Sequence, residues 1–404
     1  MDFDVVILGS DANAYTLARC YHEQYGRAAH LLAKAPMSFI RYSDIVQVTY
    51  EDAIWHEEEF LRALNSLCAS LDAERVVAIS SNEVYARFLA RNRRRIDPRI
   101  VFNYPDEELL ETLAMKDRFV EAFSASGHLP RSAVIDVDEH LLPDVDFEFP
   151  VIVKPSDVIE WNHMDFAGKK KIYKLDSRSE LETALSRISG GGYRGRLVLQ
   201  EYIPGDDSAL FDCLVYCDTS SKVRAITFAQ IGLQEHSVSM VGNAACLING
   251  FNTNGTADGV VEDFRCFMES IGHRGWAELD IKFDRRDGRY KILEINPRQG
   301  RCSYYATACG HNLVKYLVDD LVYGLTPEYC HVTDEVLLSF VPVGIIKKYV
   351  VNREFKERAL ELHSRGDVVK PLAYARDMSL TRRIFLARRA LGYYRDYKNG
   401  YWKY

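Results

Sequence analysis

The chain opens with short apolar runs that alternate with helical patterns. DVVILGS predicts a buried parallel strand, and the following DANAYTLARCYHEQYG places Ala14, Leu17, Ala18 and Tyr21 at helical spacing. AAHLLAK predicts a second strand and RVVAISS a third, each with a helix beside it. Such alternation is typical of a doubly wound α/β unit, which we predict over residues 1–105.

The first strand-to-helix turn, GSDANA, differs from a dinucleotide-binding turn. It lacks the glycines of a GxGxxG loop, and Asp11 and Asn13 at the start of the helix would crowd a pyrophosphate. The chain also offers no recognisable hydride site. The pattern therefore argues against a nicotinamide-dependent oxidoreductase.

The pattern changes after residue 105, and we predict a small lobe over residues 106–195. DEELLETLAMKDRFVEAFSASG predicts one helix, and FEFPVIVKPS predicts a strand that ends at Lys154 and Pro155. A lysine in that position can present a point charge to phosphate, or it can simply close an edge strand. SDVIEWNHMDFAGKKKIYKL predicts a loop running into a second strand, with three lysines that could close over phosphates. Of these three, we expect Lys171 to point inward.

A polar hinge and a polar island follow within residues 196–330, which we predict to form a second lobe. RLVLQEYIPG predicts an apolar strand ending in a hinge, where Glu201 and Ile203 could offer a backbone carbonyl and N–H to a nucleobase. Downstream, Glu235, His236 and Asn243 interrupt apolar strand sequence. Buried polar groups need partners, so these residues predict a substrate or metal contact, with a structural histidine as the alternative.

Two short strands near residue 285 carry the densest chemistry. AELDIKF and YKILEIN both alternate, and RDG between them predicts a three-residue hairpin loop with Gly288 at a positive φ. If Arg285 and Arg289 close that hairpin, Asp280 falls directly opposite Glu294. Two facing carboxylates repel each other, so this arrangement favours a divalent cation between them.

The same face of the hairpin carries further polar side chains. Period-2 geometry places Asn296, Arg298 and Lys282 beside the two carboxylates. Hard oxygen ligands next to cationic side chains are what a magnesium-bound polyphosphate requires. The alternative is a surface hairpin with solvated charges.

Composition is that of a globular enzyme. The 404 residues are 47% hydrophobic and 27% charged with a net charge of −7, which fits several subdomains. The nine cysteines form no CxxC and no Cys/His cluster, as expected for reduced thiols in a cytosol. No apolar run is long enough to span a bilayer, and MDFDVVILG becomes a strand at once, so we predict a cytoplasmic protein without a signal peptide.

Charge is concentrated in the last predicted segment, residues 331–404. From Lys347 to Tyr404 there are 15 Lys and Arg residues against 6 Asp and Glu. Such a basic extension can attract an anionic substrate, associate with the cytoplasmic face of a membrane, or be a solvated helical face. We expect no nucleic-acid partner, and the oligomeric state stays open.

The order of these elements resembles the ATP-grasp superfamily. The resemblance rests on Lys116, Lys154-Pro155, Gln200-Glu201-Tyr202-Ile203, Asp280 and Glu294-Ile295-Asn296-Pro297-Arg298. It implies two α+β lobes that bind Mg-ATP, phosphorylate a carboxylate and let an amine attack the acylphosphate. The implied roles are phosphate binding by Lys116, Lys154, Lys171 and Lys282, adenine binding by Glu201 and Ile203, one or two Mg²⁺ ions on Asp280, Glu294 and Asn296, catalysis by Arg298 and Arg301, and substrate binding by Glu235, His236, Asn243 and Arg301.

A closer resemblance is to the bacterial D-aspartate ligases of peptidoglycan cross-bridge synthesis and related carboxylate–amine ligases. It rests on stretches such as QEYIPGDDS, EHSVSMVGN and EINPRQGRCSYYATACGHNLVKYLVDD. It implies that the β-carboxylate of D-aspartate is joined to the lysine ε-amine of a UDP-muramyl pentapeptide, a peptidoglycan precursor. EHSVSMVGN stands where the family has an EHTP-like stretch, so the amino acid and its chirality stay open. The alternatives are a dipeptide or other amino-acid ligase and a non-catalytic ATP-sensing or scaffolding protein, although the retained metal set argues against the latter.

Overall fold

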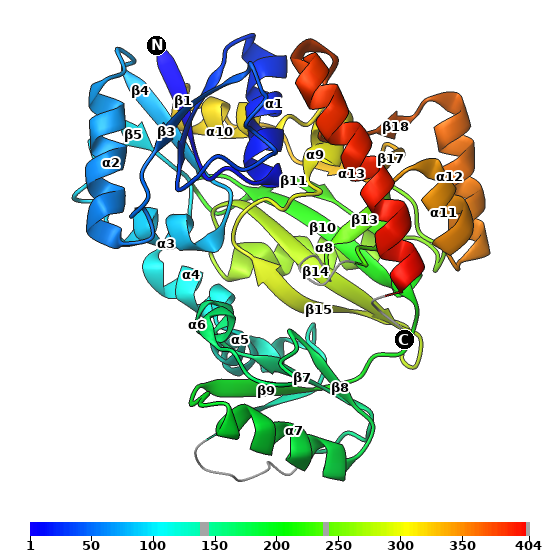
Figure 1. Cartoon of the computed structure of the whole chain (residues 1–404). Helices are drawn as coiled ribbons and strands as arrows, with labels where there is room; N and C mark the ends of the chain where they lie inside the picture. Colours follow the sequence, from blue (N-terminus) through cyan, green and yellow to red (C-terminus); the bar gives the residue numbers. More distant parts are fainter. Residues whose placement is uncertain (138–144, 237–241, 401–404) are drawn as a thin grey trace. The chain divides into compact units, whose positions relative to one another are not determined.

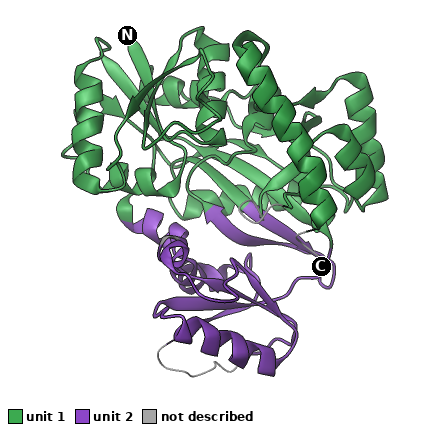
Figure 2. Ribbon diagram, viewed as in Figure 1, with its two compact units in different colours: residues 1–107, 206–279, 296–404 green, residues 108–205, 280–295 purple. Residues whose placement is uncertain are grey.

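The computed structural model describes residues 1–137, 145–236 and 242–400, which form two compact units (Figure 2). Unit 1 comprises residues 1–107, 206–279 and 296–404, and unit 2 comprises residues 108–205 and 280–295. The chain therefore enters unit 2 twice. The four predicted ranges are continuous segments that these units cut across, and as domain boundaries they stay predictions.

Unit 1 begins with a parallel sheet of order β3-β2-β1-β4-β5. The Asp11 carboxylate caps α1 by accepting the Ala14 N–H at 2.9 Å, and the Asn13 amide donates to the carbonyls of Ser81 and Gln299 at 3.0 Å. The start of this helix is thus occupied by its own side chains, as expected from its sequence. The elements are β1 (Phe3–Leu8), α1 (Ala12–Tyr25), β2 (Ala29–Ala33), β3 (Val46–Tyr50), α2 (Glu57–Ala69), β4 (Arg75–Ser80), α3 (Glu83–Arg91) and β5 (Ile100–Val101).

The expectation of a helix beside each N-terminal strand holds only in part. β2 leads to the parallel strand β3 through turns over residues 34–45, without a helix. The buried carboxylate of Asp377 holds this connection, because it accepts from the Ser43 hydroxyl and the Asp44 N–H, each at 2.8 Å. Asp377, which is far from this connection in the sequence, therefore stabilises it in place of a local helix.

A mixed nine-stranded sheet carries the rest of unit 1 (Figure 1). Two of its strands, β14 and β15, include residues 280–295, which are counted with unit 2. Its order is β15-β14-β10-β12-β13-β17-β18, with β11 paired to β10 and to β16. The strands are β10 (Leu210–Cys217), β11 (Val223–Thr227), β12 (Ala229–Gln234), β13 (Ala244–Asn249), β14 (Gly275–Asp284), β15 (Arg289–Asn296), β16 (Cys330–Val332), β17 (Val336–Ser339) and β18 (Val368–Val369). The helices between them are α8 (Asp258–Ser270), α9 (Tyr304–Ala308) and α10 (Leu313–Leu321).

The basic C-terminal segment is an integral part of unit 1. It supplies β17 and β18 to the sheet and three helices, α11 (Val343–Tyr349), α12 (Arg353–Arg365) and α13 (Leu380–Asn399). The Arg382 guanidinium is fully buried, with its Cζ 3.7 Å from the centre of the Tyr15 ring. This contact ties α13 to α1 near the start of the chain.

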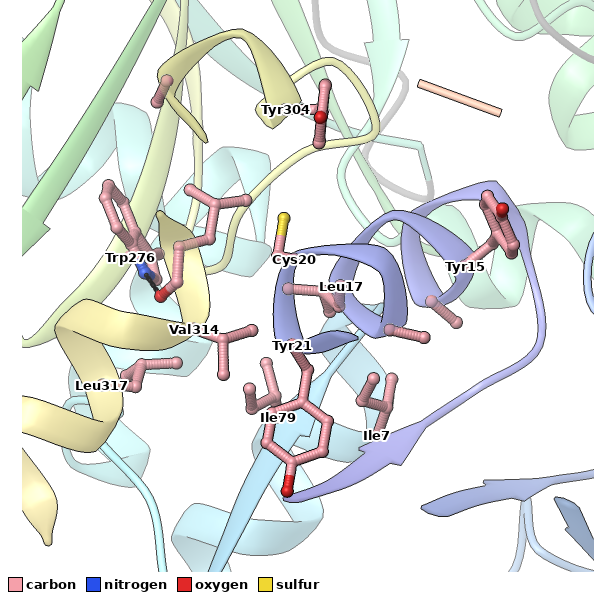
Figure 3. Close-up of a cluster of buried hydrophobic side chains, with 14 of the residues drawn as sticks. Ile7, Tyr15, Leu17, Cys20, Tyr21, Ile79, Trp276, Tyr304, Val314 and Leu317 are labelled. Atoms are coloured by element: carbon pink, nitrogen blue, oxygen red, sulfur yellow. Dashed lines mark hydrogen bonds between the residues drawn. The ribbon is translucent and has the colours of Figure 1, made fainter. Parts of the chain in front are cut away.

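One hydrophobic core joins the N-terminal sheet to the later elements of unit 1 (Figure 3). Ile7, Tyr21 and Ile79 pack in it with Trp276 and Val314. The Trp276 indole N–H donates to the Leu313 carbonyl at 2.9 Å, so the polar edge of this buried ring is satisfied. All nine cysteines are free thiols.

Unit 2 is an antiparallel sheet of order β6-β9-β7-β8 with its own core. Trp161, Tyr193 and Leu197 are buried in that core. The elements are α4 (Glu107–Ala114), α5 (Lys116–Phe123), β6 (Ser132–Asp136), β7 (Val151–Pro155), α6 (Val158–His163), β8 (Tyr173–Leu175), α7 (Arg178–Gly190) and β9 (Arg196–Glu201).

Two predictions for unit 2 are wrong in detail. The single helix predicted around Lys116 is broken at Met115, which has extended φ and ψ of −93° and 114°. Ser156 stabilises the break, because its hydroxyl accepts the Asp117 N–H at 3.1 Å and its carbonyl accepts the Lys116 N–H at 3.4 Å. The predicted loop after Pro155 contains a short helix, α6, because Trp161 is buried in the core of the unit.

Candidate active site

The hairpin of β14 and β15 ends in a four-residue turn. β14 ends at Asp284, so the predicted three-residue loop closed by Arg285 and Arg289 is wrong. The Asp284 carboxylate accepts the Arg286 N–H at 3.0 Å and pairs with the Arg286 guanidinium at 2.6 Å, which leaves Arg285 exposed in the turn. Gly288 has the predicted positive φ, 71°, and its N–H donates to the Asp284 carbonyl at 2.8 Å.

The structure brings the side chains of Asp280 and Glu294 together in unit 2. Asp280 hydrogen-bonds to Glu294, and the Lys116 Nζ lies 2.6 Å from a Glu294 oxygen. The charge of Lys116 holds the pKa of Glu294 well below its usual range, with Lys154 adding to the effect and burial opposing it. A hydrogen bond between two carboxyl groups needs a proton, and a divalent cation can take its place. The donor set therefore fits Mg²⁺, which prefers carboxylate oxygens.

Lys154 is the penultimate residue of β7 and is buried, with its Nζ 3.3 Å from the Gln200 Oε1. Burial lowers the pKa of Lys154 to about 8; the charges of Lys116 and Lys171 lower it as well, whereas the two carboxylates raise it. Three lysines thus repel one another beside one acidic pair. A bound polyphosphate would relieve that repulsion.

If Lys154 binds the ATP phosphates, as the sequence predicts, its lowered pKa should make ATP binding depend on pH. Below about 8 the amine is charged, and above it the amine loses its proton, so we expect the affinity for ATP to fall as the pH rises through this value. Bound phosphates favour the charged form, so binding near this pH should take up a proton. Calorimetry in two buffers of different ionisation enthalpy measures this uptake.

Two variants separate Lys154 from its neighbours. Lys154→Met should weaken ATP binding and abolish the proton uptake. Lys170→Met, which changes the lysine next to Lys171, should leave both unchanged. Proton uptake that persists in Lys154→Met would show that another group titrates.

The hinge after β9 is organised by the buried carboxylate of Glu201. It pairs with Arg131 at 3.0 Å, Arg286 at 2.9 Å and Lys291 at 3.3 Å. Burial by itself would raise the pKa of Glu201, but the hydrogen bonds from Arg131 and the charge of Lys291 hold it below its usual value. The Glu201 side chain is therefore fully used in ion pairs within the protein. A nucleobase could still bind the Glu201 backbone carbonyl and the backbone N–H of the buried Ile203.

The remaining predicted lysines of unit 2 also lie near the hinge or the acidic pair. The Lys282 amine lies 5.4 Å from the centre of the Tyr202 ring, and the amine of Lys174, which was not predicted as a site residue, lies 4.4 Å from the same point. Lys171 is exposed, yet close enough to Lys154 to lower its pKa. All of these contacts lie within unit 2.

In unit 1, Arg298 lies between two acidic side chains. One amine of its guanidinium lies 2.5 Å from Glu83, the first residue of α3, and donates to the Asn296 Oδ1 at 3.4 Å. The other amine lies 3.4 Å from Glu278 on β14. The Nε of Arg298 is buried and has no hydrogen-bond partner within the described part of the chain. An oriented guanidinium with donor capacity to spare suits an anionic ligand.

Glu278 is the least exposed acid beside Arg298. Burial raises the pKa of Glu278 well above its usual value, and the neighbouring Asp212 raises it further, whereas the charge of Arg298 lowers it. Gly300 allows this close packing, because a Cβ there would lie 1.7 Å from a Glu278 oxygen. The Asn296 amide donates to the same carboxyl group at 3.5 Å.

A second charged group in unit 1 connects the polar island to the C-terminal helix. The Arg301 guanidinium pairs with the buried Glu235 and lies 4.0 Å from the centre of the Phe340 ring. The Tyr393 hydroxyl on α13 donates to Glu235 at 3.1 Å and accepts from Arg389 at 2.9 Å. Helix α13 therefore helps to position the Glu235 carboxylate that pairs with Arg301.

His236 stacks on another tyrosine of α13, Tyr397, with ring centres 4.3 Å apart. Burial lowers the pKa of His236, so the imidazole is neutral near pH 7. Asn243 participates through its backbone, since its carbonyl accepts the Glu235 N–H at 2.8 Å. Residues 237–241, which form the middle of the EHSVSMVGN stretch, lie outside the described residues.

Sequence reasoning missed Glu83, Glu278 and Tyr393. Glu278 could have been found, because it stands two residues before Asp280 and so on the same face of the strand. Glu83 and Tyr393 carry no local signal, since each meets its partner only through the tertiary fold.

Two features are absent from the described residues. Within residues 1–137, 145–236 and 242–400, no three or more His, Cys, Asp or Glu side chains gather as a metal cluster. The candidate ion ligands are thus two carboxylates and an amide. In the same part of the chain, no helix is both long and apolar enough to cross a membrane.

Comparison with solved structures confirms the fold. The L-amino acid ligase of Bacillus licheniformis matches with a TM-score of 0.57 at 14% identity, covering 79% of this chain and 74% of that one. The N5-carboxyaminoimidazole synthetase of Staphylococcus aureus, solved with ADP, matches with a TM-score of 0.59 at 13% identity, covering 83% and 81%. No protein-family model matches the chain.

This fold is that of ATP-grasp ligases, as the order of the sequence motifs predicted. Among curated proteins, the chain is similar to the D-aspartate ligase of Enterococcus faecium (strain Aus0004). The two are 29% identical over 394 residues, which cover 94% of this chain and 92% of the relative. The resemblance inferred from the motifs is thereby confirmed.

Proposed function

We propose that this ligase joins the β-carboxylate of D-aspartate to the lysine ε-amine of a UDP-muramyl pentapeptide. Similarity to a D-aspartate ligase along 94% of the chain supports the choice of amino acid. The proposal that the enzyme uses ATP rests mainly on one observation: Lys116, Lys154 and Lys171 lie around the Asp280–Glu294 pair. Three lysines with one lowered pKa form a site for a polyanion.

The nucleotide is assigned to residues of unit 2 and the adjoining strand end. In this proposal Lys116, Lys154, Lys171 and Lys282 bind phosphate oxygens, and the hinge residues Glu201 and Ile203 bind adenine through their backbone. Asp280, Glu294 and Asn296 would hold one or two Mg²⁺ ions. When bound, Mg²⁺ neutralises charge on the phosphates during transfer.

The reaction consists of two transfers. A substrate carboxylate oxygen takes the γ-phosphoryl group of ATP, which releases ADP and leaves an acylphosphate. The amine nitrogen then attacks the acyl carbon, an amine proton is lost, and phosphate leaves with the former carboxylate oxygen. Arg298 is assigned to the oxyanion of the tetrahedral intermediate, because its buried Nε is a donor with no protein partner among the described residues.

The amino-acid substrate is assigned to the group around Arg301. Arg301 would bind the α-carboxylate while Glu235 holds the guanidinium in place. His236 is neutral near pH 7 because burial lowers its pKa, so it would act as a hydrogen-bonding group rather than as a second cation. Asn243 supports Glu235 through its backbone carbonyl.

Tyr393→Phe should raise the KM for D-aspartate about 5- to 10-fold, because removing the hydroxyl costs about 1 kcal/mol of hydrogen bonding to Glu235. The turnover number and the KM for ATP should stay close to those of the wild type. ADP release, measured as the amino-acid concentration is varied, gives all three constants. Tyr394→Phe is the matched control, since the neighbouring ring is exposed. An equal loss of ATP affinity would show that Tyr393 supports the fold rather than the amino-acid site.

The proposed function is tested by ADP release across a panel of D- and L-amino acids, with and without UDP-muramyl pentapeptide. We expect release with D-aspartate to depend on the pentapeptide. Release with amino acids alone, yielding a dipeptide, would assign the chain to amino-acid ligation instead. ATP binding without carboxylate-dependent ADP release would identify a nucleotide sensor or scaffold.

A further inference from the structure

The outer face of α13 carries an apolar stripe. Leu380, Ile384, Ala387, Leu391 and Tyr394 recur at intervals of four and three residues, which places them along one side of a helix. Leu380 and Leu391 are 75% and 70% exposed, and Ile384 and Tyr394 are 45% and 46% exposed. The Tyr394 hydroxyl packs against Gly344 of α11, while the leucine side chains of the stripe face away from the described part of the chain.

The opposite face fixes α13 to unit 1. Arg382, Tyr393 and Tyr397 are buried, and the Arg382 guanidinium donates to the carbonyls of Phe39 and Leu372 at 2.8 and 3.1 Å. Figure 1 shows the helix, in red, along the outside of the unit. The stripe is therefore held outward by a rigid attachment and does not belong to a loose tail.

Basic side chains border the stripe. Arg383, Arg388, Arg395 and Lys398 are all exposed. The helix has six Lys and Arg residues and one acidic residue, Asp396, whose carboxylate lies 3.3 Å from Arg395. A regular apolar stripe with cationic borders is typical of helices that lie in the interface of an anionic membrane.

We propose that the outer face of α13 binds the surface of an anionic lipid bilayer, with the leucine and isoleucine side chains inserted and the bordering arginines near lipid phosphates. A second copy of the chain fits this face less well, because a two-fold contact would bring the same arginines together. Charge complementarity instead favours an anionic surface. The proposal does not depend on which amino acid the enzyme ligates.

Vesicle co-sedimentation of the full chain tests the proposal. The vesicles are phosphatidylcholine alone, or phosphatidylcholine partly replaced by phosphatidylglycerol. We expect at least about 10-fold stronger binding to the anionic vesicles, weakening as salt is added. Leu391→Asp and Arg388→Glu should each reduce this binding by about 10-fold or more, since one removes insertion and the other reverses a bordering charge.

Two substitutions elsewhere in unit 1 are matched controls. Val351→Asp changes an apolar side chain that is 74% exposed, and Arg353→Glu reverses a guanidinium whose side chain is 89% exposed; neither lies on α13. Both should bind like the wild type, and thermal melting should show all variants folded. Equal binding to both vesicle types, no binding to either, or equal losses in the controls would overturn the proposal. So would a dimer that Leu391→Asp disrupts without any lipid binding, because the face would then belong to a second copy.

Discussion

Replacing Glu294 with glutamine should raise the Mg²⁺ concentration needed for half-maximal ADP release and lower turnover at physiological Mg²⁺ by about 100-fold or more. The substitution keeps the shape of the side chain and removes the charge that faces Lys116 at 2.6 Å. Without that charge the remaining oxygen is a poorer ligand for a divalent cation. The lysines, in contrast, lose an acidic neighbour, so the site becomes more positive.

That change of charge gives Glu294→Gln a second, opposite signature. Free ATP, in the absence of Mg²⁺, should bind at least as tightly as it does to the wild type, whereas a misfolded variant would lose binding under both conditions. Calorimetry without metal and ADP release across Mg²⁺ concentrations measure the two effects. Asp287→Asn, which removes a carboxylate from the turn of the same hairpin, is the control and should leave the Mg²⁺ dependence unchanged. An unaltered Mg²⁺ requirement in Glu294→Gln would reject Glu294 as an ion ligand.

Arg298→Ala should lower turnover by about 100- to 1,000-fold, the size expected when a donor to a developing oxyanion is lost. ATP affinity should stay within about twofold, because the lysines that we assign to the phosphates are separate residues. Stopped-flow or steady-state ADP release gives turnover, and calorimetry gives the affinity. A parallel loss of both would reject the role of Arg298 in stabilising the intermediate.

Arg298 also pairs with Glu83 at 2.5 Å, so Arg298→Ala leaves a carboxylate without its cation. The double variant Arg298→Ala/Glu83→Gln removes both charges and should recover thermal stability. If Arg298 acts on the intermediate, turnover should remain low in the double variant. Recovery of turnover together with stability would show that Arg298 only balances the charge of Glu83.

The two hairpin strands show how far the sequence pattern reaches. Alternation over AELDIKF and YKILEIN was sufficient to predict the strands and the approach of Asp280 to Glu294, because side chains of a strand alternate between its faces. The same reasoning misplaced the turn by one residue. The end of β14 depends on the ion pairs of Asp284 with Arg286 and Lys291, which no local pattern records.

Helix α5 shows a different limit. The residues around Met115 have good helix propensity, so the sequence predicts an uninterrupted helix. The break arises because Ser156, at the end of another strand, takes over the N–H groups of Lys116 and Asp117. That break starts a new helix at Lys116 in unit 2, where the amine reaches Glu294.

The basic C-terminal segment was interpreted from its charge alone. Charge predicted attraction to anions or membranes, but it did not reveal that Tyr393 and Tyr397 face Glu235 and His236. A helix buries one face and exposes another, and which face is which follows from the surface that it packs against.

The sequence by itself determined the class of fold, the order of the ATP-grasp motifs and the approach of Asp280 to Glu294, because these depend on local periodicity and on short motifs. Only the tertiary structure decided that Lys154 has a lowered pKa, that Glu83 and Glu278 flank Arg298, and that α13 reaches the Arg301–Glu235 group. Burial and the approach of charges from distant segments set these properties. They depend on distances in space that the spacing of residues along the chain does not contain.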